Sequence, residues 1–212
     1  ALRFFQQALD IHIRLVGAEP DRADYQRDLS VSYERLGDHM VATGQGEDTL
    51  RFFQQAHDIT ARLVGAEPDR ADYQRDLSVS YTKLGDLMVA LGRGEDALRF
   101  FQQAHDITAR LAGAEPDRAD YQRDLSVSYE RLGDLLANSG RFDDAVAHYE
   151  LSLPIANKLA ETQPNRPSLQ QDLRITYGRL ASLSRSAGQH SAADRFQQQA
   201  DELAEQISRA SA

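Results

Sequence analysis

The chain has 212 residues, with 24 Lys or Arg, 33 Asp or Glu and a formal net charge of −9 at pH 7. Its hydrophobic share of 41% fits a folded, soluble protein, and no apolar run approaches the ~20 residues of a membrane-spanning helix. The absence of cysteine excludes disulfides, thiolate metal sites and cysteine nucleophiles, and the acidic balance disfavours nucleic acid as a partner. We therefore expect a cytoplasmic protein that binds neither membranes nor nucleic acid.

The sequence repeats itself with a period of 48 residues. The segment 27–33 returns at 75–81 and again at 123–129, and residues 27–74 and 75–122 differ at seven positions, so 41 of 48 are identical. The pattern reaches both ends of the chain, which predicts a single array over residues 1–212. This array comprises an unpaired helix at 1–20, three repeats at 21–68, 69–116 and 117–164, and a divergent C-terminal capping repeat at 165–212.

Each repeat carries two helical patterns, which we call helix A and helix B. In the second repeat, the apolar stripe of helix A steps by three or four residues and comprises Tyr73, Leu77, Tyr81, Leu84, Met88 and Leu91. The stripe of helix B comprises Ala97, Phe101, Ala104, Thr108 and Leu111. Gly113 and Pro116 are expected to end helix B, and Asp117 with Asp120 to cap the next helix A.

In chain order, these patterns predict a B-type helix at about 2–16 and then four A/B pairs, nine helices in all. Strand patterns are absent. In the fourth B helix, Pro154 is expected to bend the helix, and the polar last helix at 191–209 is expected to cap the array. Because each pair buries its stripe only by stacking on its neighbours, we predict an all-α fold, an α-solenoid of antiparallel helix pairs.

The spacing within a repeat resembles the tetratricopeptide repeat (TPR) family, whose pattern sets an aromatic residue, Leu-Gly, a small residue, an aromatic residue and another small residue at fixed positions. The second repeat matches it with Tyr81, Leu84, Gly85, Ala97, Phe101 and Ala104. The third matches it with Tyr129, Leu132, Gly133, Ala145, Tyr149 and Ser152. The family unit has 34 residues, so the longer unit here is similar to kinesin-light-chain repeats and to bacterial long-helix TPR arrays.

The resemblance implies a right-handed solenoid that acts as a protein–protein interaction or ligand-sensing module, without catalysis and without a cofactor or metal. The excess of Arg over Lys and the many Ala residues favour a bacterial source. The sequence starts inside a B-type helix without Met, so we expect a module of a larger protein. Its expected partner is a protein or a peptide.

In TPR arrays the A helices line the concave face, and the Leu-Gly position sets which side chains are exposed there. We call the predicted binding surface the A-helix face. Its basic row is Arg35, Lys83, Arg131 and Arg179, its acidic row is Asp38, Asp86 and Asp134, and its apolar row is Val31, Val79 and Val127. The chaperone-tail clamp of some family members is mostly missing, because Glu34, Thr82 and Glu130 stand where its Lys would be.

Two interpretations of this face remain open. Either a peptide or protein segment binds it, or the basic and acidic rows neutralise each other within a helix or between adjacent repeats. His57 and His105 lack metal-ligand spacing and are expected to pack between helices, and Ser30 and Ser32 are expected to form polar surface or inter-helix contacts.

The first predicted helix leaves an apolar face with incomplete cover, formed by Phe4, Phe5, Ala8, Ile11 and Leu15. An exposed apolar patch favours association. The alternative function is therefore a structural scaffold that self-associates end to end through this helix.

Overall fold

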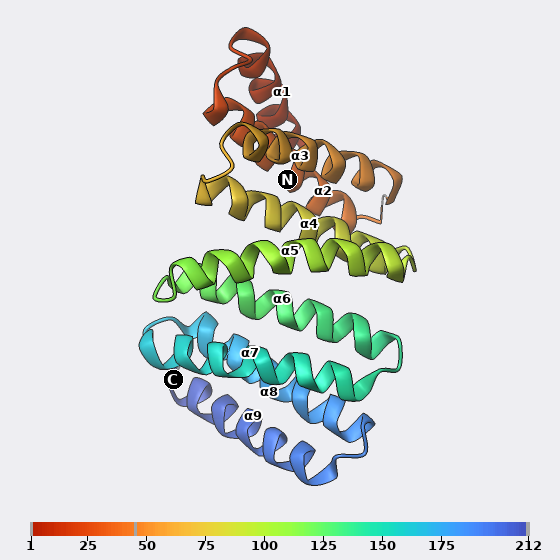
Figure 1. Cartoon of the computed structure of the whole chain (residues 1–212), viewed down its shortest axis with the longest axis vertical. Helices are drawn as coiled ribbons and strands as arrows, with labels where there is room; N and C mark the ends of the chain where they lie inside the picture. Colours follow the sequence, from red (N-terminus) through yellow and green to blue (C-terminus); the bar gives the residue numbers. More distant parts are fainter. Residues whose placement is uncertain (1, 45, 211–212) are drawn as a thin grey trace. The chain divides into compact units, whose positions relative to one another are not determined.

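The computed structural model describes residues 2–44 and 46–210. The two ends of the predicted array, residue 1 and residues 211–212, lie outside the described residues. Within these ranges there are nine α-helices and no strand (Figure 1). The helices are α1 (Leu2–Ala18), α2 (Ala23–Ala42), α3 (Gly46–Ala66), α4 (Ala71–Ala90), α5 (Gly94–Ala114), α6 (Ala119–Asn138), α7 (Phe142–Thr162), α8 (Pro167–Ser186) and α9 (His190–Ala210). The all-α prediction is confirmed.

The helices form two compact units, an N-terminal unit up to Ile107 and a C-terminal unit from Thr108, with the boundary inside α5. In the N-terminal unit α2 packs against α1 and α3, and α3 packs against α4. In the C-terminal unit α6, α7, α8 and α9 pack in that order. Even-numbered helices are the predicted A helices, and odd-numbered helices are the B helices.

Glycines of the Leu-Gly positions let the two helices of a repeat approach closely. A Cβ atom built on Gly85 of α4 would lie 2.4 Å from Cε1 of Phe101 on α5, and one built on Gly37 of α2 would lie 2.4 Å from Phe53 on α3. In the C-terminal unit, Gly133 faces Tyr149 in the same way, at 2.7 Å. The aromatic ring of helix B therefore packs directly on the backbone of helix A.

A second set of glycines closes the turn from helix A to helix B. Gly44, Gly92, Gly140 and Gly188 have φ values between 71° and 77°, a left-handed conformation that glycine adopts without strain. The predicted stripe of helix A is buried at Tyr73, Leu77, Leu84 and Met88, but Leu91 is 48% exposed. Leu91 is exposed because it already occupies the C-terminal cap of α4, one turn before the chain reverses.

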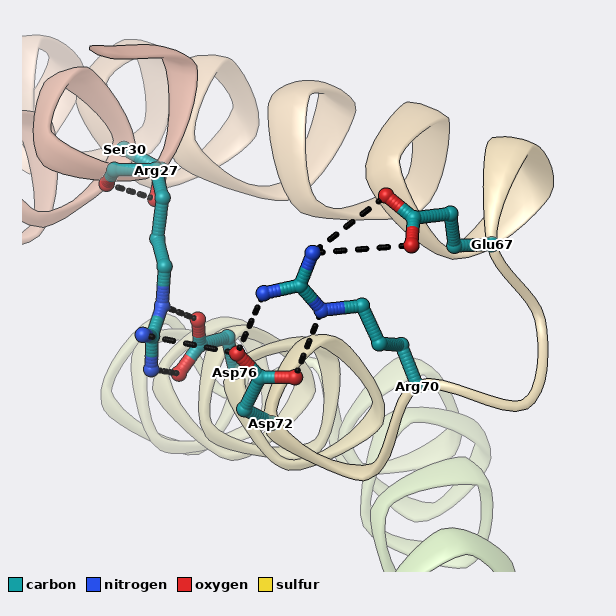
Figure 2. Close-up of polar contacts among 6 residues, drawn as sticks. All are labelled: Arg27, Ser30, Glu67, Arg70, Asp72 and Asp76. Atoms are coloured by element: carbon teal, nitrogen blue, oxygen red, sulfur yellow. Dashed lines mark hydrogen bonds and ion pairs between the residues drawn. The ribbon is translucent and has the colours of Figure 1, made fainter. Parts of the chain in front are cut away.

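Arginine, rather than aspartate, precedes each of the first three A helices. The residue at the N-cap of α6 is Arg118, and no side chain caps this helix, so the predicted Asp117–Asp120 capping pair is wrong. Arg118 binds Asp120 and Glu115 on either side of it, as Arg70 binds Asp72 and Glu67 in the preceding repeat (Figure 2). The ion pairs of Arg118 and of Arg70 thus stabilise the turns that join a helix B to the next helix A.

Proline does not interrupt the fourth B helix, since α7 runs from Phe142 to Thr162 with Pro154 inside it.

None of the helices in the described ranges has the length and apolarity needed to cross a membrane.

Candidate functional site

The A-helix face of the N-terminal unit brings two predicted site residues into direct contact. Lys83 of α4 donates to Asp38 of α2, with Nζ and Oδ1 2.5 Å apart. The two side chains are 31% and 40% exposed. This pair joins the basic and acidic rows across adjacent repeats, one of the two arrangements that the neutralisation hypothesis allows.

The apolar row stays accessible beside these charges. Val31 of α2 is 42% exposed and Val79 of α4 is half-buried. In the C-terminal unit Val127 of α6 is half-buried, and Ile175 at the equivalent position of α8 is 48% exposed. Arg35 and Arg179 are also exposed. Each unit therefore presents aliphatic side chains next to charged groups on its A helices.

Asp134 of the acidic row has a partner that its position in the sequence did not indicate. Tyr149 of α7 donates its hydroxyl to Asp134, at 2.8 Å. Burial, together with the neighbouring carboxylate of Asp134, raises the pKa of Tyr149, so the phenol stays protonated and keeps donating. The predicted residues Arg131 and Asp86 also take part in polar or electrostatic interactions.

A second set of ion pairs joins adjacent A helices. Arg27 of α2 donates to Asp76 of α4 through Nε at 2.5 Å and Nη2 at 3.2 Å, and its Nη1 lies 3.6 Å from Asp72 (Figure 2). In the C-terminal unit, Arg123 of α6 contacts Asp172 of α8 at 2.8 Å. Sequence reasoning missed these pairs, although an Arg and an Asp separated by 49 residues, one more than the period, are a usable signal.

Two half-buried glutamates also lie on this face. Burial raises the pKa of Glu34 on α2 to about 7, although the charge of Lys83 counteracts part of this effect. Burial likewise raises the pKa of Glu130 on α6, although the hydrogen bonds that Glu130 accepts from Thr176 and Ser152 counteract part of this effect. Both residues occupy the position three before the Leu-Gly glycine, where the second repeat has Thr82.

A pocket of about 210 Å³ opens on the C-terminal unit between α6, α7 and α8. Its lining is mainly aliphatic and includes Val127, Ala156, Leu159, Leu169 and Ile175. Polar groups also line it, namely the Arg123–Asp172 pair and the hydrogen-bonded Glu130 and Thr176. Such a lining suits an aliphatic side chain flanked by hydrogen-bonding groups.

The histidine expected to pack between helices does so. His57 of α3 lies 3.1 Å from the hydroxyl oxygen of Ser80, and its ring centroid lies 4.7 Å from that of Tyr81. Burial lowers the pKa of His57, which favours the neutral ring. Ser30 is buried and donates to the carbonyl oxygen of Arg27, and Ser32 lies 2.7 Å from His12 Nδ1 of α1.

The Arg27–Asp76 pair should contribute modestly to stability. We expect a double-mutant cycle with Arg27→Ala and Asp76→Ala to give a coupling energy of ~0.5–1 kcal/mol, because both side chains are partly exposed. Urea unfolding at low and high salt measures this energy, which should fall as salt screens the charges. A coupling energy that does not change with salt would contradict the assignment as a screened ion pair.

The fold and the repeated close approach of helices A and B define an all-α helical-repeat solenoid. Two family models described as tetratricopeptide repeat match the chain, at residues 77–120 and 127–158. Both matches lie in repeats whose residue spacing resembles this family, so they confirm the resemblance over these residues.

Solved structures with the same fold are distant in sequence. BtubC (BKLC) from P. vanneervenii is 17% identical, with a TM-score of 0.70, 98% of this chain and 91% of that chain covered. The nearly identical TPR-like repeats of a P. anserina protein named after kinesin light chains are 20% identical, with a TM-score of 0.60 and coverage of 97% and 89%. The apo form of RapI is 13% identical, with a TM-score of 0.67 and coverage of 96% and 64%. No curated protein matches the sequence.

Proposed function

We propose that the chain is a protein–protein interaction module that binds a peptide or protein segment on its A-helix face. The observation that carries this proposal is the pocket of the C-terminal unit, which is lined by Val127, Ile175 and other aliphatic side chains and by the ion-paired Arg123 and Asp172. An aliphatic side chain of the partner enters this pocket and loses its contact with water, which supplies most of the affinity.

The charged groups around the pocket supply orientation rather than affinity. Exposed ion pairs contribute only ~0–1 kcal/mol each, so a partner's carboxylate or ammonium group can exchange with them at little cost. Arg123 and Asp172 are the groups placed to make such an exchange in the C-terminal unit, and Lys83 and Asp38 in the N-terminal unit. Besides Lys83 and Asp38, the basic row includes Arg35, Arg131 and Arg179, and the acidic row includes Asp86 and Asp134.

In this proposal the module is part of a larger bacterial, cytoplasmic protein and performs no catalysis of its own. Polar side chains on its A-helix face serve as structural partners of one another, as Lys83 and Asp38 do. The alternative function, end-to-end self-association through α1, uses a different surface. A light-scattering dilution series tests it, and a mass that stays monomeric at every concentration would contradict it.

The binding proposal predicts that a charge in the pocket removes binding. Peptides selected from a random phage-displayed library on the parent chain should carry an aliphatic residue, and Ile175→Glu should weaken their binding at least tenfold. Leu151→Glu is the matched control, because Leu151 on α7 is similarly exposed at 52% and does not line the pocket. Equal binding to both variants, each with parental helicity, would place recognition elsewhere.

A further inference from the structure

The first helix presents an apolar face to solvent. We call the set Phe4, Phe5, Ala8, Ile11 and Leu15 the α1 face. Phe4 is 74% exposed and Ile11 is 56% exposed, while Phe5, Ala8 and Leu15 are half-buried. Phe5 also packs against the core around Leu9 that α1 shares with α2, and its ring centroid lies 5.9 Å from that of His39 on α2. The rest of the α1 face is therefore an apolar surface on a helix that is already packed on one side.

The next B-type helix, α3, shows what covers the equivalent face elsewhere in the N-terminal unit. The equivalent residues of α3, 48 positions on, are Phe52, Phe53, Ala56, Ile59 and Leu63, and the last four are at most 4% exposed. Helix α2 contributes to this cover, because Tyr33 stacks on Phe52 with ring centroids 6.2 Å apart and Gly37 lies against Phe53. In the next repeat Tyr81 and Gly85 meet Phe100 and Phe101 in the same way.

We propose that the α1 face binds one more A-type helix, supplied from outside residues 1–212 and seated on α1 as α2 is seated on α3. No helix among the described residues occupies this position. The partner helix carries an aromatic residue to stack on Phe4 and, four residues later, a glycine to lie against Phe5. This inference does not depend on the proposed function of the A-helix face.

A second copy of the chain is not the occupant in this proposal, because its own A helices are engaged. Gly37, Gly85 and Gly133 each lie against an aromatic ring of the B helix in the same repeat. A second copy could offer one of these helices only by opening a repeat and exposing the core behind it. A free A-type helix meets no such obstacle.

The test uses a labelled peptide with the sequence of residues 69–92, which contains helix α4, and fluorescence anisotropy with the intact chain. We expect saturable binding that falls at least tenfold in the Phe4→Glu, Ile11→Glu double variant. Both substitutions are at exposed positions, and circular dichroism checks that the variant keeps its helicity. Leu151→Glu, at another exposed apolar position, is the control and should bind the peptide as the parent does.

A second peptide separates specific seating from general hydrophobic attraction. Gly85→Leu in the peptide makes it a better helix former and more apolar, yet it should bind at least tenfold more weakly, since its side chain would meet Phe5 as a Cβ on Gly85 would meet Phe101. Equal binding of both peptides would overturn the proposal. So would equal peptide binding to the α1 variant, or a dimer of the parent chain that the α1 variant abolishes.

Discussion

Gly85→Ala should lower the free energy of unfolding by ~1–3 kcal/mol. The added methyl group would lie 2.4 Å from a ring carbon of Phe101, a side chain that is only 3% exposed and is enclosed by the core. Neither the ring nor the backbone of α4 can move without opening contacts between the two helices of the repeat, and overpacking of this kind costs ~1–3 kcal/mol. Urea or thermal unfolding measures the change.

Gly178→Ala is the matched control for this substitution. Gly178 is also inside an A helix, α8, but a Cβ built on it has no heavy atom within 4 Å. Alanine is a better helix former than glycine by ~1 kcal/mol, so Gly178→Ala should stabilise the chain or leave it unchanged. If both variants lost the same stability, the close contact between Gly85 and Phe101 would not be the cause.

The second large effect is a dependence of stability on pH that Glu34 introduces. Its pKa is raised from 4.5 to about 7 in the folded chain because its carboxyl group is buried. Between these values the folded state retains a proton that the unfolded state has released. The free energy of unfolding should therefore fall as pH rises from 4.5 to 7, by an amount on the order of 1–3 kcal/mol.

Glu34→Gln should remove this loss, because the amide resembles the protonated carboxyl and does not ionise. We expect the variant to be more stable than the parent at pH 8 and nearly equal to it at pH 5. Unfolding curves at several pH values provide the measurement, with Glu150→Gln as the control because Glu150 is exposed on α7. A parent and a Glu34→Gln variant with parallel stability curves over this range would contradict the assignment.

The fold could be predicted from the sequence because the same pattern of apolar residues and glycines recurs in several repeats. The spacing of Leu84, Gly85 and Phe101 recurs in other repeats, so the helix pairs and their close approach could be predicted from the sequence alone. The caps were not, since Asp117 matches a capping pattern while Arg118 takes the N-cap position and binds the acidic residues on both sides. Ion pairs across the start of the helix take the place of a side-chain cap.

The contacts of the A-helix face were predicted only in part. The Leu-Gly register placed Val31 and Val127 where they lie, but the partner of Asp134 comes from helix B through Tyr149, which a pattern within helix A does not contain. The raised pKa of Glu34 on α2 depends on burial and also on the charges of Lys83 and Asp76 on α4, so the pattern of a single helix does not show it. Contacts between repeats, rather than positions within a repeat, were the missing information.

The 49-residue spacing of the Arg27–Asp76 and Arg123–Asp172 pairs has an evolutionary consequence. In both pairs the Arg is on the earlier A helix and the Asp is on the later one, so the pairs have a direction along the chain. A gene that gains or loses one whole 48-codon segment within residues 27–172 keeps this order, because Arg27, Arg75 and Arg123 and also Asp76, Asp124 and Asp172 recur with the 48-residue period. Unequal recombination between near-identical segments can therefore change the length of the array and keep the order of these charged residues.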